Sequence, residues 1–451
     1  MTLAVASDAA VRPGEATLRP SLRVAIVPDL SGTLEPCGCT RDTAGGIDRL
    51  AAALDALARE PVPLLKLATG AVFARPNDPV HSRPQREQAE LRTEAMTAAL
   101  QRLDLDALAL RTEDLTAYAP RLAQLVRAGR PHLLGLASHP ELNLQGSALL
   151  GEHVGVVSTL GENWSMDSAT SRIATRVNEL RSQGARLVIL VADAETSAAD
   201  RATNVGADLV IRSDGRPDTS KSEVGAAVEL RGGYQGEGLW VLDIWRNDDQ
   251  SPGLQLLKQA PAATDPAPGH AVLATYRRLD RQAPQDPTLR RLLDQLFARI
   301  NERNAALALD EPTAQAGAKH TAYVGSKTCA ACHTQAYFWW LGTQHGRAYA
   351  SLQARKRELD LDCVGCHVTG FAEPGGANLA SLTQLAGVGC ESCHGPGGKH
   401  VDDPRRIAPE IHRQVGANKC ISCHDAQHSD PFEYEKSRAA LLTPAHGGSG
   451  R

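Results

Sequence analysis

Residues 329–333 are CAACH, and the same pattern of two cysteines, two intervening residues and a histidine returns as CVGCH (363–367), CESCH (390–394) and CISCH (420–424). These four motifs contain eight of the ten cysteines in the 451-residue chain. Most of the histidines lie in the same final third. The chemistry of this protein is therefore expected to be concentrated there.

The spacing within each motif is the attachment signature of a c-type haem. The two thiols form thioethers with the two vinyl groups of one haem, and the adjacent histidine binds the iron. We predict four covalently attached haems c. The expected attachment residues are Cys329, Cys332, Cys363, Cys366, Cys390, Cys393, Cys420 and Cys423, and the expected proximal ligands are His333, His367, His394 and His424.

Two other uses of cysteine pairs are weaker explanations. A zinc site built from such pairs would take two pairs for each metal ion, and it would not need a histidine after every pair. A disulfide framework would not impose the same two-residue gap four times. The motifs begin 34, 27 and 30 residues apart, and chains below about 40 residues rarely build a core of their own. The haems should therefore share one core and lie close together, which suits electron transfer along a row.

The second axial ligand of each iron has to come from outside the motifs. The three methionines, at positions 1, 96 and 166, lie far from the motifs, so His/Met ligation is not favoured. The histidines available from residue 320 onward are His320, His345, His400, His412, His428 and His446. For each of them the residues alone leave open whether it is a ligand or a surface histidine.

Residues 322–446 resemble the tetrahaem cytochrome family typified by the electron acceptor of hydroxylamine oxidoreductase. The resemblance rests on AYVGSKTCAACHTQAYFWWLGTQHGRAY, CVGCHVTGFAEPGG, GVGCESCHGPGGKHV and KCISCHDAQHSDPFEYEK. It implies distal ligands at His345, His400 and His446. Independently of the resemblance, His412 is a further candidate for the fourth. The resemblance also implies redox partner proteins, and some relatives assemble into extracellular filaments, which leaves a homo-oligomer or filament open. Some members have one five-coordinate haem.

The first half of the chain alternates strand-like and helix-like patterns, which is typical of an α/β domain with a largely buried sheet. Helices are predicted over 45–60 and 171–184, and two more over 270–308 with a break at 282–287. The segments starting at 226 and 238 are expected to form a closing pair of strands. The other strands are predicted over 22–28, 63–68, 106–110, 132–138, 186–192 and 207–211. The fold class is thus an α/β domain followed by a mainly α or irregular multihaem domain, with expected boundaries at 1–21 (tail), 22–259, 260–319 (linker and helical hairpin) and 320–451.

VAIVPDLSGTLEPCGC and GGIDRLAAAL in the N-terminal part resemble the metallophosphatase domain of periplasmic 5'-nucleotidases, a family with a layered α/β fold that uses two metal ions. The resemblance implies metal ligands that this chain has mostly replaced. The departures are Ser31 after Asp29 and Leu30, Ala71 after Gly70, Arg111 and Thr112 before Glu113, and histidine-free loops at 191–193 and 212–215. We therefore predict a degenerate domain, inactive as a phosphatase, that serves in binding, docking or support.

Cys37 and Cys39 lie in the same N-terminal part, and the single residue between them would strain a disulfide bond. Metal binding, pairing with another partner and buried free thiols all remain open for these two cysteines.

The function expected from these features is electron transfer between redox partners, without a catalytic residue. One alternative is a redox enzyme with one open haem site, acting on a small nitrogen or sulfur compound. Another is an active phosphohydrolase that carries haems. Haem attachment takes place outside the cytoplasm, so the protein is expected to be periplasmic or extracellular, although no leader peptide is recognisable at the N-terminus. A net charge of -4 does not favour nucleic acid, and no apolar run suggests a membrane span.

Overall fold

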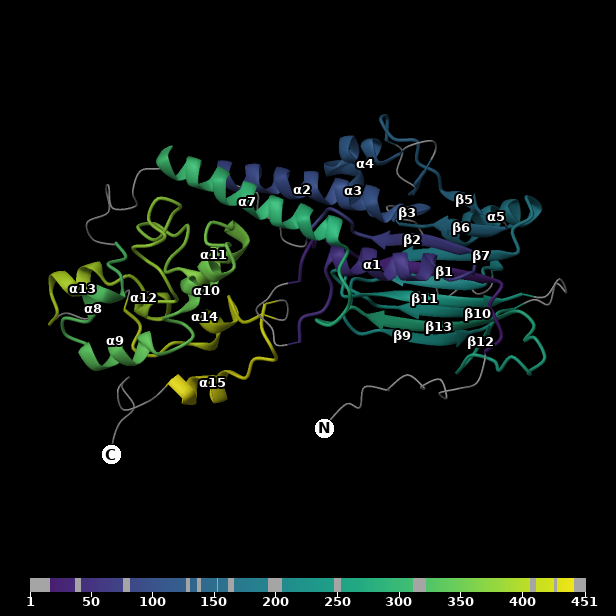
Figure 1. The fold of residues 1–451 in the computed structure, drawn as a ribbon. Helices are drawn as coiled ribbons and strands as arrows, with labels where there is room; N and C mark the ends of the chain where they lie inside the picture. The colour runs from purple at the N-terminus through teal and green to yellow at the C-terminus, as the bar shows by residue number, and fades with distance from the viewer. Residues whose placement is uncertain are drawn as a thin grey trace. The chain divides into compact units, whose positions relative to one another are not determined.

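The structure is a computed structural model. It describes residues 17–36, 42–75, 82–126, 130–135, 139–151, 153–160, 166–193, 205–246, 253–310, 322–405, 411–425 and 428–441, with the main chain alone at 166–169 and 193. The chain divides into two compact units (Figure 1). We call residues 1–36, 43–79 and 92–291 the α/β unit, and residues 37–42, 80–91 and 292–451 the haem-motif unit.

The α/β unit contains two sheets. The seven-stranded sheet has the order β12-β13-β11-β1-β2-β3-β4, and the six-stranded sheet has the order β5-β6-β7-β8-β10-β9. In the first sheet β1 is parallel to β2 and antiparallel to β11. Its strands are β1 (Leu22–Pro28), β2 (Leu64–Gly70), β3 (Ala107–Leu110), β4 (His132–Leu134), β11 (Gly238–Trp245), β12 (Gln255–Leu256) and β13 (Ala271–Arg278). Those of the second are β5 (Ser147–Leu150), β6 (Val154–Ser158), β7 (Leu187–Asp193), β8 (Leu209–Ser213), β9 (Ser220–Val224) and β10 (Ala227–Arg231).

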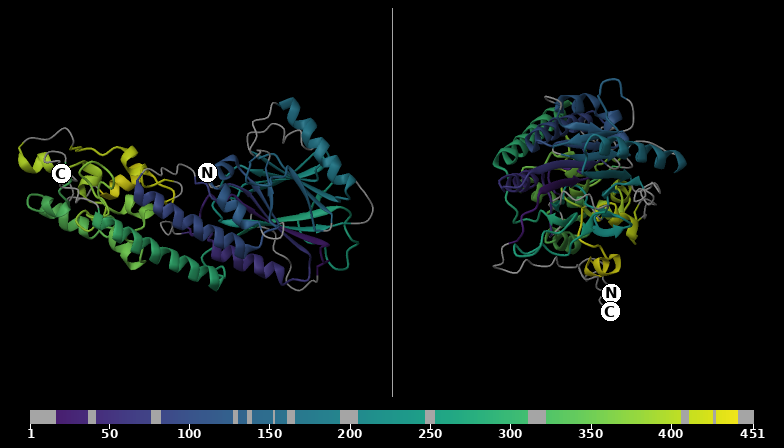
Figure 2. Two further views of the ribbon diagram at one scale, coloured as in Figure 1. Left: turned by 90° about the horizontal axis from the view of Figure 1, so that it is seen from above. Right: turned by 90° about the vertical axis from the view of Figure 1, so that its right-hand side faces the viewer.

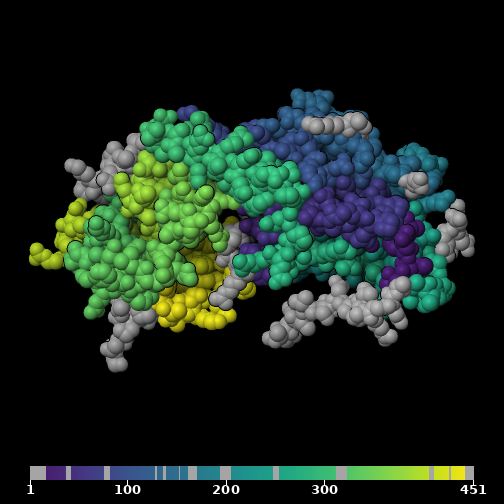
Figure 3. All heavy atoms as spheres, viewed as in Figure 1, coloured from purple at the N-terminus to yellow at the C-terminus, as the bar shows by residue number. Residues whose placement is uncertain are grey.

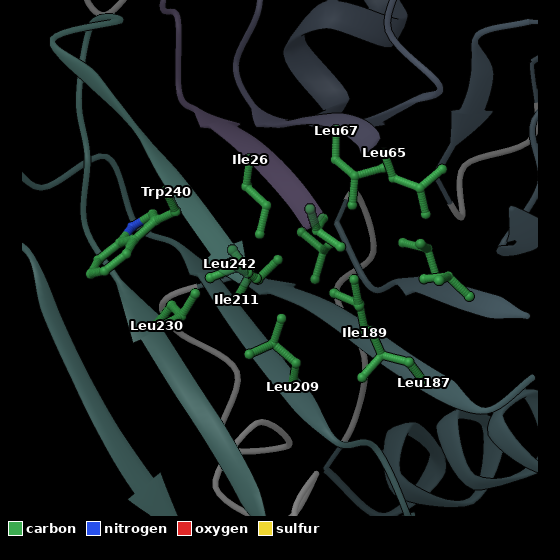
Figure 4. Close-up of a cluster of buried hydrophobic side chains, with 14 of the residues drawn as sticks. Ile26, Leu65, Leu67, Leu187, Ile189, Leu209, Ile211, Leu230, Trp240 and Leu242 are labelled. Carbon is green, nitrogen blue, oxygen red and sulfur yellow. The ribbon is translucent and has the colours of Figure 1, made fainter. Parts of the chain in front are cut away.

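The main core of this unit lies between the two sheets. Ile26, Leu67 and Leu242 from the first sheet meet Ile189 and Ile211 from the second, and all are buried (Figure 4). Because side chains alternate between the faces of a strand, each central strand also offers apolar residues to its outer face. Helices cover those outer faces.

Helix α5 (Met166–Ser182) packs on the six-stranded sheet, and Ile173 and Val177 share a buried cluster with Val188 and Val210. It runs along one side of the strands in both views of Figure 2. Helix α1 (Ile47–Ala58) contacts β2 of the other sheet. The remaining helices that begin before residue 130 are α2 (Arg83–Leu103), α3 (Thr112–Ala117) and α4 (Ala119–Leu125).

The α/β class and most of the predicted elements are confirmed. β1, β2, β3, β7 and β8 match the predicted apolar runs to within about two residues, as is usual for element boundaries. β4 lies at the predicted place, but 136–138 fall outside the described residues. Helix α1 lies within the predicted range 45–60. Helix α5 begins five residues before the predicted range 171–184 and overlaps most of it.

The strands form two sheets. Two expectations about single elements are wrong. β10 and β11 do not pair with each other, because the chain passes from one sheet to the other through Gly232 and Gly233, both with positive φ. The helix expected from residue 270 is strand β13, because its Val, Thr and Tyr side chains favour strand and it pairs along the full length of β11. A short apolar run of this kind does not distinguish helix from strand.

The haem-motif unit consists of short helices and turns, and most of α7 (Pro287–Asp310) belongs to it. Leu307, Tyr349, Val364 and Leu382 belong to its one small apolar cluster among the described residues. Its atoms, light green to yellow in Figure 3, form a closely packed body. The other helices are α8 (Ser326–Cys329), α9 (Thr334–Leu341), α10 (Ala348–Ala354), α11 (Leu361–His367), α12 (Cys390–His394), α13 (Gly398–Asp402), α14 (Ala417–Ile421) and α15 (Tyr434–Leu441). No helix in the described part of the chain combines the length and the apolar character that crossing a membrane requires.

A buried polar network ties the two long helices to the second motif within this unit. Asn304 of α7 donates to Gln88 Oε1 of α2 at 3.0 Å and to the Leu359 carbonyl at 2.7 Å. Gln88 in turn donates to Asp360 Oδ1 at 2.9 Å. Asp360 caps α11, the helix that contains the motif at 363–367. The position of this motif is therefore set by side chains far away in the sequence.

Candidate haem-binding site

Each of the four motifs forms about one turn of helix. The second and third lie within α11 and α12, while the first and fourth begin at the ends of α8 and α14. The His333 amide donates to the Cys329 carbonyl at 2.8 Å, and the His424 amide donates to Cys420 at 2.9 Å. Residues three and four positions apart share one face of a helix. Both thiols and the imidazole of a motif therefore face the same side.

The thiols of different motifs contact one another in two pairs. Cys329 donates a hydrogen bond to Cys390, and this bond together with burial raises the pKa of Cys329. The same hydrogen bond lowers the pKa of Cys390 to about 6, against the opposing effect of burial. A hydrogen bond with Cys366 lowers the pKa of Cys423, also to about 6. All eight motif thiols are free of disulfide bonds. The first motif thus adjoins the third, and the second adjoins the fourth.

Two of the motif histidines face a histidine from outside the motifs. The ring centres of His333 and His400 are 6.3 Å apart, and those of His345 and His424 are 6.0 Å apart. Bonds between a metal and an imidazole nitrogen are about 2 Å long, so two imidazoles on opposite sides of one metal have ring centres roughly 6 Å apart. Both pairs therefore have the spacing that a shared iron requires.

The other two motif histidines have their Nδ1 atoms bound to backbone carbonyls. His367 Nδ1 donates to Ala348 O at 2.8 Å, and His394 Nδ1 donates to His412 O at 2.7 Å. Metal-binding histidines usually donate their second ring N–H in this way, which leaves Nε2 directed at the metal. The thiols, the histidine pairs and these hydrogen bonds together fit a c-type haem at each motif.

The remaining candidate histidines differ in burial and in hydrogen-bond partners. His400 Nδ1 is buried and lacks a hydrogen-bond partner among the described residues. The His412 side chain is exposed, and its backbone carbonyl holds His394. His428 Nδ1 donates a hydrogen bond to Asp425 Oδ1 at 2.9 Å. His320, His446, Cys37 and Cys39 lie outside the described residues.

The aromatic stretch after the first motif positions His345. The Trp340 indole donates to the Val388 carbonyl at 2.8 Å, and the Val388 amide donates to the His345 carbonyl at 3.0 Å. The Phe432 ring stacks on His424, with ring centres 4.8 Å apart. The pair formed by His345 and His424 is thus supported from both sides by residues close in sequence to its members.

Glu391 is a buried residue of this region that lies outside the predicted site. It occupies the first intervening position of the third motif and is only 3% exposed. Its carboxylate binds backbone amides from two other segments. A sequence signal for it does exist, since it is the only charged residue among the eight intervening positions of the four motifs.

In the α/β unit, polar side chains gather where β1, β2, β3 and β8 end. Ser31 donates to Asp29 Oδ1 at 2.5 Å, and the Arg111 guanidinium lies 3.5 Å from Asp29 Oδ2 while donating to the Ser213 carbonyl. Burial raises the pKa of Asp29, against the opposing effects of Ser31 and Arg111. A cation from the chain itself therefore lies beside this carboxylate, while the nearby Asp214 also helps to raise its pKa. Among the described residues, no group of three or more His, Cys, Asp or Glu side chains is placed to hold a metal ion.

Solved structures similar to the chain include two phosphoesterases. The 5'-nucleotidase precursor from Thermus thermophilus is 15% identical, with a TM-score of 0.45 over 65% of this chain and 60% of that chain. The calcineurin-like phosphoesterase YfkN from Bacillus subtilis is 11% identical, with a TM-score of 0.45 over 63% of this chain and 99% of that chain.

Cytochromes match the haem-motif unit. The model of the family described as cytochrome c554 and c-prime matches residues 328–395. Cytochrome c-554 of Nitrosomonas europaea is 30% identical over 172 residues, which cover 31% of this chain and 73% of that protein. The C-type polyheme cytochrome OmcB of Geobacter sulfurreducens is 36% identical over 72 residues, 15% of this chain and 9% of that protein. The cofactor is therefore covalently attached haem c, and the role of the haem-motif unit is multihaem electron transfer. The chain belongs to the cytochrome c554 family.

Proposed function

We propose that the protein carries electrons between redox partner proteins outside the cytoplasm, through four haems c held by its four motifs. The observation that carries this proposal is the placement of two motif histidines opposite a second histidine, at 6.3 and 6.0 Å between ring centres. When bound, haem supplies a one-electron iron couple. Two histidines bound to one iron would leave no open position there, which favours electron transfer over binding of a substrate at the iron.

The axial pairs that we propose are His333 with His400 and His345 with His424. Each pair joins a motif to a histidine that is distant in sequence, so ligation would also cross-link the fold of the haem-motif unit. For His367 and His394 we propose ligation through Nε2, because their Nδ1 atoms donate to carbonyls. His446 is the distal ligand that we propose for one of these two, on the family resemblance alone.

Contacts between motifs support transfer from one haem to the next. Cys329 contacts Cys390, and Cys366 contacts Cys423. Each of these sulfur atoms is an attachment point at the periphery of a haem. The attachment points of the first and third motifs therefore adjoin, as do those of the second and fourth.

Replacement of the proposed distal ligands tests this function. His400→Ala and His345→Ala should each convert one low-spin haem of the oxidised protein to a high-spin haem, because one axial ligand is lost. Electron paramagnetic resonance and near-infrared magnetic circular dichroism measure the number of haems in each spin state. A variant that keeps as many low-spin haems as the parent would contradict the assignment of that ligand.

His412→Ala tests the remaining candidate ligand, whose exposed ring is in neither pair and whose carbonyl contact with His394 is retained in the variant. A new high-spin haem in this variant would identify His412 as a fourth distal ligand, but we expect none. The spectrum of this variant should equal that of the parent. A high-spin haem in the parent that binds small molecules would instead support the alternative, a redox enzyme for a nitrogen or sulfur compound.

For the α/β unit we propose a role in docking or assembly, including the kind of filament that some relatives form, without phosphohydrolase activity. Arg111 supports this proposal because its guanidinium lies against Asp29 at the end of β1. A positive side chain at this position disfavours a metal cation.

A further inference from the structure

Glu391 connects three segments of the haem-motif unit through its carboxylate. Oε1 accepts hydrogen bonds from the Val324 amide at 2.9 Å and the Gly397 amide at 2.7 Å. Oε2 accepts from the Gly325 amide at 2.7 Å. A carboxylate that accepts several backbone N–H groups forms stronger hydrogen bonds than a neutral acceptor.

These amides stand at the starts of the two helical segments that matter for one histidine pair. Gly325 is the N-cap of α8, which leads to Cys329 and His333. Gly397 is the N-cap of α13, which contains His400. Glu391 therefore holds the proximal and the distal histidine of this pair relative to each other.

The packing around Glu391 leaves little freedom for other arrangements. A Cβ atom at Gly397 would lie 3.1 Å from Glu391 Oε1, and one at Gly398 would lie 3.0 Å from the Ala322 carbonyl. The Gly398 amide donates to that same carbonyl at 3.1 Å. The glycines before His400 thus allow α13 to approach both the carboxylate and the segment before the first motif.

We propose that Glu391 is a positioning residue that keeps His400 opposite His333 and places a negative charge where the first and third motifs adjoin, bound to the Gly325 amide and next to Cys390 in the chain. This inference rests on the proposed axial pair. A general role in the core would be expected to affect all four haems alike, whereas a positioning role affects one haem. A negative charge nearby favours the oxidised iron, so it would also lower the midpoint potential of the haem nearest to it.

Two substitutions separate the charge from the geometry. Glu391→Gln removes the charge and replaces one acceptor oxygen by a donor amide, so at least one of the three backbone amides loses its partner. Glu391→Asp keeps the charge and both oxygens but is one methylene shorter. Glu435→Gln is the control, because its side chain is 79% exposed and lies in the same unit.

In Glu391→Gln we expect all four haems to be attached, as counted by mass spectrometry. Part of one haem should become high-spin, and the midpoint potential of one haem should rise in a redox titration. Glu391→Asp should restore that potential towards the parent value. In a His400→Ala background, Glu391→Gln should add no further high-spin haem, because both changes act on the same ligand.

A parent-like spectrum and potential in Glu391→Gln would overturn the inference. So would a high-spin signal that adds to that of His400→Ala, or the loss of all four haems in both Glu391 variants, since these results would identify a general core residue. If His400→Ala itself leaves the spectrum unchanged, the proposed axial pair fails first and the inference fails with it. These outcomes distinguish failure of the inference from failure of the proposed ligand.

Discussion

At the scale of single residues, the motif cysteines and histidines can be predicted from the sequence because their chemistry depends on five consecutive positions. The partners of those histidines cannot be predicted in this way. His333 faces His400, and His345 faces His424, across long stretches of intervening chain. Two other histidines outside the motifs have different contacts: the His412 carbonyl accepts from His394, and His428 contacts Asp425. The residue type alone therefore does not identify a distal ligand.

Buried carboxylates of the α/β unit show the same dependence on surroundings. Asp114 is fully buried and accepts hydrogen bonds from the amides of Val72, Phe73 and Ala74 at 2.7 to 2.9 Å. Burial raises its pKa to about 6, and the three hydrogen bonds only partly oppose this effect. Nothing in the local sequence TEDLTA distinguishes Asp114 from Glu113 as the buried residue.

Asp114→Asn should change how stability depends on pH. Between an unfolded pKa of about 3.9 and the folded pKa of about 6, only the folded parent keeps the proton, so its free energy of unfolding falls as pH rises through this window. The variant lacks this titration. Relative to the variant, the parent should therefore lose about 2 kcal/mol between pH 4 and pH 7.

Urea unfolding followed by circular dichroism at both pH values measures this difference. Asp104→Asn is the control, because the Asp104 side chain is 76% exposed. Equal pH dependence in the parent and in Asp114→Asn would show that Asp114 does not titrate in this window.

At the scale of elements, two glycine N-caps show that neighbouring residues determine whether a side chain fits at the N-cap of a helix. Gly389 caps α12 and Gly416 caps α14, with nearly the same φ of -78° and -77°. A Cβ atom at Gly389 would lie 2.5 Å from Ser326 Oγ and 2.6 Å from Thr369 Oγ1. At Gly416 nothing lies within 4 Å. The two caps are equivalent in backbone conformation and differ in packing.

Gly389→Ala should destabilise the haem-motif unit by about 1–3 kcal/mol, the usual cost of overpacking a buried site. The added methyl group displaces hydroxyl groups that hold the Cys390 and Gly389 amides. Gly416→Ala should be close to neutral. Thermal unfolding followed in the Soret region compares the two variants, and equal melting temperatures would contradict the prediction.

The elements themselves could be predicted from sequence where local pattern and tertiary context agree. β1 is a continuous apolar run that is buried throughout, and α1 has apolar residues at helical spacing that match its buried face, and both are confirmed. β13 was expected to be a helix, because a short apolar segment is compatible with both structures. Its antiparallel pairing with β11, which lies earlier in the chain, makes this segment a strand.

At the scale of the whole molecule, the two units differ in what stabilises them and in their chemistry. The α/β unit has an extensive apolar core between its sheets, and the haem-motif unit has a small cluster around Leu307 and Val364. The thiols and histidine pairs belong to the second unit. In the first, Arg111 lies against the carboxylate at the end of β1.

Chelation should therefore leave the function of the holoprotein unchanged. After dialysis against EDTA, we expect the haem spectra and the rate of reduction by a chemical donor to equal those of the untreated protein. Addition of Mn²⁺ or Zn²⁺ should produce neither bound metal nor hydrolysis of a phosphate ester. Metal bound in stoichiometric amount together with turnover would contradict an inactive α/β unit, and Arg111→Ala tests whether the arginine is what excludes the metal.

The sequence by itself determined the cofactor and its mode of attachment, because thioether and proximal-ligand chemistry need only one helical turn of contiguous residues. It also determined the α/β class, because burial leaves a period of two or 3.6 in the chain. Only the tertiary structure decided which histidines face each other, that β10 and β11 belong to different sheets, and that Glu391 joins two segments. These features arise from contacts between residues far apart in the chain, for which a single sequence carries no local pattern.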